Sequence, residues 1–149
     1  MRIAEMPAPD LAALLEHVSR LKHDLGKYVR FQGRWLPPDS GLDARREALA
    51  TDLLHTRRGP DGSVDALQVW ADFAPVLAGI EHPELARIRE SMAALEPVVA
   101  DLRTAEGAGA LVDVEVVAAG EAAADTVADA VARLAKVVRQ AAADAGVGR

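Results

Sequence analysis

Apolar side chains recur at intervals of three and four residues from about residue 110 to residue 145, near the end of the chain. The residues that keep this spacing are Val112, Val116, Ala123, Val127, Val131, Leu134 and Val138. Because an α-helix makes one turn in 3.6 residues, the spacing puts all of them on one face. Asp129 and Arg133 add a favourable charge pair one turn apart. We therefore predict one long amphipathic helix over residues 110–145.

The start of this segment allows a second interpretation. Residues 111–116 largely alternate between apolar and charged side chains, which is the pattern of a half-buried strand. A single strand would have no pairing partner elsewhere in the chain. Helix is therefore the prediction for these residues, and strand remains the alternative.

Four earlier segments show the same helical spacing. They cover about residues 10–36, 39–57, 63–78 and 83–103. Asp10 is expected to cap the first of these helices, and Ser63 or Asp65 the third. Pro75 and Pro97 are expected to kink or divide the helices that contain them. Turns are predicted where glycine and proline gather between the helices, at residues 58–62, 79–82 and 106–109.

The composition supports an all-α fold. Of the 149 residues, 31 are alanine, the best helix former, and only 3% are aromatic. Short connections between neighbouring helices favour antiparallel packing. We predict a single domain over residues 1–149, folded as an up-and-down bundle of four or five helices.

Two absences in the sequence limit the classes of function. The chain contains no cysteine, which excludes disulfides, thiol nucleophiles and thiolate metal sites. The first ten residues lack the apolar core of a secretory signal, and no window approaches the roughly 18 apolar residues of a membrane span. We therefore expect a cytoplasmic protein without a membrane span.

The net charge of −6 is unevenly distributed along the chain. Residues 11–36 carry five cations against two anions, whereas residues 37–149 carry a net charge of −8. The five cations, here called the basic strip, are Arg20, Lys22, Lys27, Arg30 and Arg34. An acidic body argues against binding to the phosphate backbone of nucleic acids. The strip is expected to bind an acidic surface of a protein partner, or else to be a solvated helix face.

His23 lies within the basic strip and is the main candidate for chemistry. It is two residues from both Leu21 and Leu25, hence about 200° around the helix from each of these core positions. We therefore expect an exposed imidazole. A neutral imidazole is a competent nucleophile near neutral pH, and the neighbouring Asp24 could orient the ring.

Around His23 the sequence resembles two families of helical bundles. The pair His23-Asp24 is similar to the His and acidic residue of histidine-kinase dimerisation helices. Histidine-phosphotransfer domains carry a Lys and a Gly about one turn after the His, and Gly26-Lys27 has them in the opposite order. The resemblance covers about ten residues. It implies a phosphoacceptor role for His23, with Asp24 as the orienting group and Lys27 as the charge partner of the phosphoryl group.

The same residues are similar to another motif. Residues 23–27 resemble the pentapeptide of HD-domain metal phosphohydrolases, in which the His and the Asp bind a metal. That family needs a further His well upstream, and the only earlier histidine is His17. Six residues of helix separate it from His23 by about 240°, so the two rings do not share a face. We therefore disfavour this hypothesis and expect neither a metal nor a cofactor.

The aromatic residues give a weaker functional hypothesis. Tyr28, Phe31 and Trp35 end the first predicted helix and are expected to pack in the core. Trp35 beside Arg34 is also a candidate partner-binding site, because both residue types are enriched in interfaces. Taken together, the sequence predicts a non-enzymatic helical adaptor of the bacterial signalling type. Histidine phosphotransfer is the alternative, and a homodimer is also allowed.

Overall fold

Helices make up most of the described chain. The computed structural model describes residues 1–27, 36–55, 57–59 and 62–147. The elements, in order, are η1 (Ile3–Glu5, a 3₁₀ turn), α1 (Ala8–Leu21), η2 (Lys22–Lys27, a π-helical turn), α3 (Leu42–Leu54), β1 (Arg57–Gly59), β2 (Gly62–Val64), α4 (Ala66–Leu77), α5 (Pro83–Ala108) and α6 (Val114–Asp144). The fold is an all-α bundle with one short hairpin. The up-and-down order and the single domain remain predictions.

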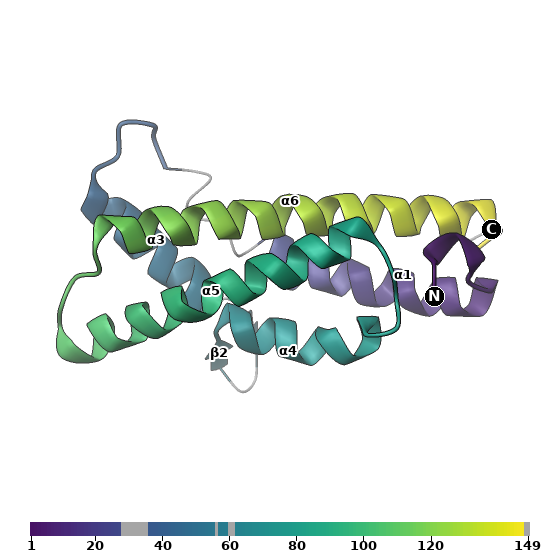
Figure 1. Cartoon of the computed structure of the whole chain (residues 1–149), viewed down its shortest axis with the longest axis horizontal. Coiled ribbons are helices and arrows are strands. Elements are labelled where there is room, and N and C mark those ends of the chain that lie inside the picture. Colours follow the sequence, from purple (N-terminus) through teal and green to yellow (C-terminus); the bar gives the residue numbers. More distant parts are fainter. Residues whose placement is uncertain (28–35, 56, 60–61, 148–149) are drawn as a thin grey trace.

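The two longest helices organise the bundle. The helix α6 extends from one end of the molecule to the other, and α5 runs beside it in the opposite direction (Figure 1). Helix α1 and turn η2 pack against α6, whereas α3 packs against α6 near its N-terminal end and also against α5. Helix α4 contacts α5, α1 and α3. Together, α5 and α6 contact every other described α-helix.

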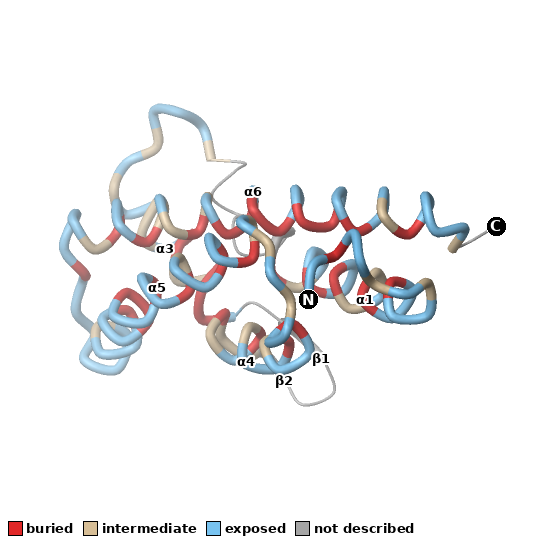
Figure 2. Tube along the Cα trace, turned by 45° about the vertical axis from the view of Figure 1, so that its right-hand side comes forward, coloured by how far each residue is buried: buried red, intermediate tan, exposed pale blue. Residues whose placement is uncertain are grey.

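Burial follows the predicted helical spacing along α6. Val127, Val131, Leu134 and Val138 are all buried. Buried and exposed positions alternate along the α6 tube in Figure 2, as one inward face requires. The small residues Ala124, Ala128, Ala130, Ala135 and Ala142 lie on the buried side too. The alanine-rich sequence therefore lets neighbouring helices approach α6 closely.

Gly120 of α6 lies very close to side chains of two other helices. A Cβ atom built there would lie 2.8 Å from Leu49 Cδ2 of α3 and 2.9 Å from Val98 Cγ1 of α5. Real Cβ atoms essentially never come this near to other heavy atoms. The absence of a side chain at Gly120 is therefore what allows α3, α5 and α6 to meet at this point.

The connection between α5 and α6 differs from the prediction. Residues 106–108 are helical rather than a loop, and α5 ends at Ala108. It is followed by Gly109, whose φ of 65° suits glycine. The Ala110 N–H donates to the Ala105 carbonyl at 2.8 Å, which closes the last turn. Residues 110–113 are neither helix nor strand, and α6 begins at Val114. The prediction of helix was therefore wrong for the first four residues and right from Val114 onward.

A β-hairpin stands where a turn was predicted. Strands β1 and β2 pair antiparallel, with Arg57 opposite Val64 and Gly59 opposite Gly62. The predicted second helix accordingly ends at Leu54 and does not reach residue 57. The hairpin was not predicted because its two strands are only three residues long and carry no apolar alternation.

Other helix limits shift by a few residues. Helix α1 begins at Ala8 rather than near Asp10, because Pro9 fits the first turn of a helix. Asp65 caps α4 by accepting the Gln68 N–H at 2.8 Å. It is one of the two residues predicted as this cap. Neither Pro75 nor Pro97 ends its helix. In the described residues, no helix has the length and apolar content needed to cross a bilayer.

Candidate functional site

The inward face of α1 fixes the direction of His23. Leu14, Val18 and Leu21 are buried at helical intervals, and Leu25 of η2 continues the buried series. The His23 side chain lies opposite them and is 61% exposed. The ring is therefore accessible from solvent, as the spacing predicts.

The imidazole of His23 is oriented by its neighbour. Its Nδ1 lies 3.1 Å from Oδ1 of Asp24, whose side chain is mostly buried. A carboxylate can only accept a hydrogen bond, so the pairing favours the tautomer with hydrogen on Nδ1. That tautomer leaves a lone pair on Nε2. The geometry is that of an exposed imidazole ring oriented by a carboxylate.

The backbone around His23 is a π-helical turn rather than a regular α-helix. Such turns arise as local insertions in helices and are frequent at functional sites. Turn η2 directly continues α1 and packs against α6 and α4, so two neighbouring helices hold its backbone. The wider turn still leaves Leu21 and Leu25 inside and His23 outside.

The basic strip is described only in part. Arg20 donates to Glu16 Oε1 at 2.9 Å, and both side chains are largely exposed. An exposed pair of this kind adds little to stability. The Lys27 side chain and the residues Arg30, Arg34 and Trp35 lie outside what the structure describes. Their predicted roles as charge partner and binding residues therefore remain predictions, as does the core role of Tyr28 and Phe31.

The metal hypothesis is not supported by the position of His23. The hypothesis of an HD-type phosphohydrolase predicts that His23 is buried and binds a metal, whereas the ring is exposed. In the part of the chain that the structure describes, no three His, Asp or Glu side chains are grouped as metal ligands. His17 is half-buried on α1.

A groove between α3 and the C-terminal part of α5 was not predicted. It has a volume of about 350 Å³, and the residues that line it are Asp43, Arg46, Glu47, Ala50, Leu102, Ala105, Glu106, Ala110, Leu111 and Val112. We call it the α3–α5 groove. Leu111 at its edge is 71% exposed, the highest value among the large apolar residues that the structure describes. Leu111 falls outside the predicted helical stripe, but nothing in the sequence indicates a groove beside it.

The edge of the α3–α5 groove is held in place by Arg46. Its Nε donates to the Val112 carbonyl at 2.8 Å, and its Nη1 donates to Asp43 at 3.1 Å. Next to it, Arg45 makes two hydrogen bonds to Glu121 of α6, at 2.5 and 3.2 Å. The hydrogen bonds and the charge of Glu121 raise the pKa of Arg45 above its usual value. Two adjacent arginines thus join α3 to α6 and to the connection before it.

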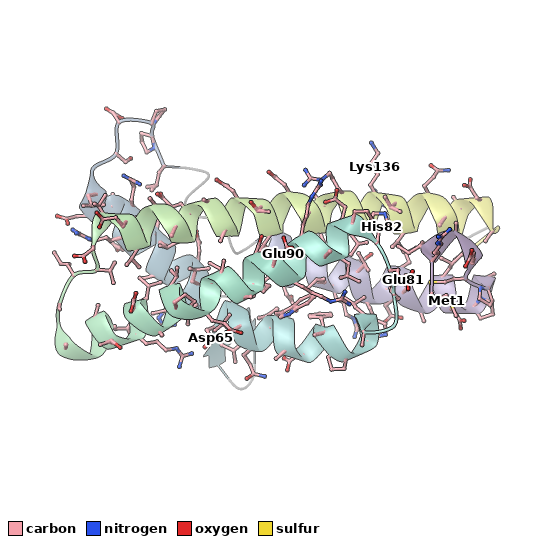
Figure 3. The ribbon with its side chains drawn as sticks, in the orientation of Figure 1. Met1, Asp65, Glu81, His82, Glu90 and Lys136 are labelled. Atoms are coloured by element: carbon pink, nitrogen blue, oxygen red, sulfur yellow. The ribbon has the colours of Figure 1, made fainter. Side chains whose placement is uncertain are left out.

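Two further hollows lie elsewhere on the molecule. The larger one, about 930 Å³, lies between η1, the α4–α5 connection and α6. His82 in its wall caps α5, since its Nδ1 accepts the Glu84 N–H at 3.1 Å. The other, about 400 Å³, lies beside Asp65, which Figure 3 shows at the start of α4. Asp65 also forms an ion pair with Arg103 of α5.

Asp52 is a buried carboxylate that the sequence analysis missed. It is only 4% exposed, and it is the one charged residue in the buried part of the described chain. Its position on α3, three residues after the buried Leu49, could have indicated burial.

Comparison of the chain with known protein families, curated proteins and solved structures found no match.

Proposed function

We propose that this chain is a non-enzymatic helical interaction module of the bacterial signalling type, which binds a protein partner in the cytoplasm. The observation that carries the proposal is the exposure of Leu111 at the edge of the α3–α5 groove. Single exposed apolar residues are common on proteins, but apolar side chains gathered around a hollow are typical of interaction sites. Leu111 lines this groove together with the apolar residues Ala105 and Leu102.

The backbone that presents Leu111 is fixed before any partner binds. Gly109 closes the end of α5, and Arg46 holds the Val112 carbonyl on the other side of Leu111. A side chain on a fixed backbone loses little conformational entropy on binding, which favours affinity. The exposed side chain of Leu111 on a hydrogen-bonded backbone supports a binding role for the connection between α5 and α6.

The proposal is tested by identifying a partner and measuring its binding to purified variants. The tagged chain is used for affinity capture from the native cell, and the captured protein is then purified and titrated calorimetrically. We expect saturable binding to the wild type, weakened about tenfold by Leu111→Gln. Val76→Gln is the control, because Val76 is also an exposed apolar residue but lies on α4.

Three outcomes would contradict parts of this proposal. If no purified candidate binds saturably, the interaction role is wrong. If binding survives Leu111→Gln but is lost in Arg30→Glu or Arg34→Glu, the basic strip is the binding surface. If the chain sediments as a dimer that Leu111→Gln dissociates, the surface serves a homodimer instead.

Histidine phosphotransfer is a second candidate, favoured by the contact between His23 Nδ1 and Asp24 Oδ1. With hydrogen on Nδ1, the lone pair on Nε2 would attack the phosphorus of a donor phosphoryl group. An N–P bond forms, the bond from phosphorus to the donor atom breaks, and its electron pair leaves with the donor. Asp24 would stabilise the positive charge that develops on the ring.

This second candidate is tested with phosphoramidate as a chemical phosphoryl donor. We expect acid-labile phosphate on the wild type, none on His23→Gln, and slower labelling of Asp24→Asn because its ring is less well oriented. The variant His17→Gln, on the preceding helix α1, is expected to label like the wild type. Equal labelling of His23→Gln and the wild type would refute the assignment, and so would the absence of any label.

A further inference from the structure

The α3–α5 groove carries a distinct charge. Among its lining residues, Asp43, Glu47 and Glu106 are exposed carboxylates, and Arg46 is the one cation. Arg46 is already engaged by Asp43 and by the Val112 carbonyl. The groove therefore offers two further carboxylates, Glu47 and Glu106, to whatever binds there.

The lining between these carboxylates is apolar and made partly of small side chains. Leu102 is buried, whereas Ala50 and Ala105 are half-buried and leave space above them. Leu111 and Val112 line the groove where α5 connects to α6. A volume of about 350 Å³ accommodates a few apolar side chains rather than a large ligand. An apolar groove edged by carboxylates matches a helix with one apolar face and flanking cations.

We propose that the α3–α5 groove binds the apolar face of a basic amphipathic helix supplied by a partner protein. This inference rests on the proposed interaction role and names the chemistry of the partner. The apolar anchors of the helix would lie over Leu102 and Ala105, beside Leu111. Its lysines or arginines would face Glu47 and Glu106, since opposite charges at the edge of an interface favour association and the correct partner.

The sign of the charge argues against other occupants. A symmetric dimer through this groove would bring the same surface of two copies together, so carboxylates would face carboxylates. Anionic membrane surfaces and nucleic acids would be repelled in the same way. A basic helix from another protein is the occupant that both the apolar lining and the edge charges favour.

The test is an NMR titration of the full chain with a synthetic peptide. The probe is an amphipathic helix of leucine and lysine, and the control peptide has glutamate in place of every lysine. We expect saturable shifts of the backbone amides of Ala50, Leu102, Ala105 and Val112 with the lysine peptide, and none with the glutamate peptide. Raising the salt concentration should weaken the binding, because edge charges are screened.

Charge-reversed variants locate the charge contribution. We expect the double variant Glu47→Lys/Glu106→Lys to bind the lysine peptide about tenfold more weakly, since two attractive contacts become repulsive. The matched control is Glu90→Lys/Glu96→Lys on exposed positions of α5 outside the groove; Figure 3 labels Glu90 on that helix. This control should bind the peptide like the wild type.

Several outcomes would overturn the inference. They are no saturable binding of the lysine peptide, equal binding of the two peptides, amide shifts that map to α1 or α4, and equal weakening in both double variants. A purified partner that binds the Glu47→Lys/Glu106→Lys variant as well as the wild type would also overturn it. In that last case the interaction role would stand and only the partner chemistry would be wrong.

Discussion

Replacing Gly120 by alanine tests the helix packing most sharply, because two opposing effects of similar size meet there. In a helix interior, alanine is more favourable than glycine by about 1 kcal/mol. The new Cβ atom would, however, lie 2.8 Å from Leu49 and 2.9 Å from Val98. Ordinary contacts between carbon atoms are about 3.5–4.0 Å.

Neither neighbour of Gly120 can move away without disturbing the core. Leu49 and Val98 are both buried, so a shift of either side chain disturbs other core contacts. The contact atom of Val98 is a methyl group directly on its Cβ, and branching at Cβ restricts its rotation. Overpacking of this kind costs about 1–3 kcal/mol. We therefore expect Gly120→Ala to lower the free energy of unfolding by roughly 1 kcal/mol.

Gly107 provides the matched control for this substitution. It lies in the last turn of α5, and a Cβ atom built there meets nothing within 4 Å. Gly107→Ala should therefore raise the free energy of unfolding by up to about 1 kcal/mol. The measurement is urea unfolding followed by circular dichroism, with equal m-values required for the comparison.

A double-mutant cycle assigns the cost to the neighbour. In a Leu49→Ala background, one of the two close contacts is removed, so Gly120→Ala should be less destabilising than in the wild type. The expected coupling energy is about 0.5–2 kcal/mol. If Gly120→Ala instead stabilises the wild type as much as Gly107→Ala does, the close approach of α3, α5 and α6 is refuted.

Three further substitutions test local features of the structure. His82→Ala should cost about 1 kcal/mol in urea unfolding through loss of the α5 cap, whereas His82→Asn should cost little, because Asn also caps helices; equal losses would contradict the cap. Asp65→Ala should lower the free energy of unfolding by about 1–2 kcal/mol, because it removes both the α4 cap and the ion pair with Arg103. Asp65→Asn should retain most of the cap, and an Asp65→Asn variant as unstable as Asp65→Ala would argue against the capping role. Arg46→Ala should speed amide hydrogen exchange in residues 110–113 while α4 exchanges unchanged, and identical exchange would show that the hydrogen bond to Val112 does not hold the connection.

The long helices could be predicted because their apolar spacing is regular over many turns. The buried face of α6 contains the predicted Val127, Val131 and Leu134, since tertiary packing and helical period agree there. The same argument predicted the exposure of His23 from the two leucines that flank it. Which side of a helix a residue lies on can thus be predicted from the spacing of its apolar neighbours in the sequence.

The α3–α5 groove could not be predicted, because it depends on how separate elements pack. Its edge depends on the hydrogen bond from Arg46 to Val112, two residues far apart in the sequence. The burial of Asp52 was also missed, since a carboxylate on a helix is ordinarily expected to face solvent. Pairing of β1 with β2 is likewise a matter of backbone geometry in a segment without an apolar pattern.

Photo-crosslinking in living cells tests whether a partner helix binds at Leu111. A photoreactive amino acid is placed at position 111, and in a second strain at position 76 of α4. We expect one crosslinked partner from position 111, joined through a basic amphipathic segment, and no such product from position 76. The same products from both positions, or no product from position 111, would contradict the claim.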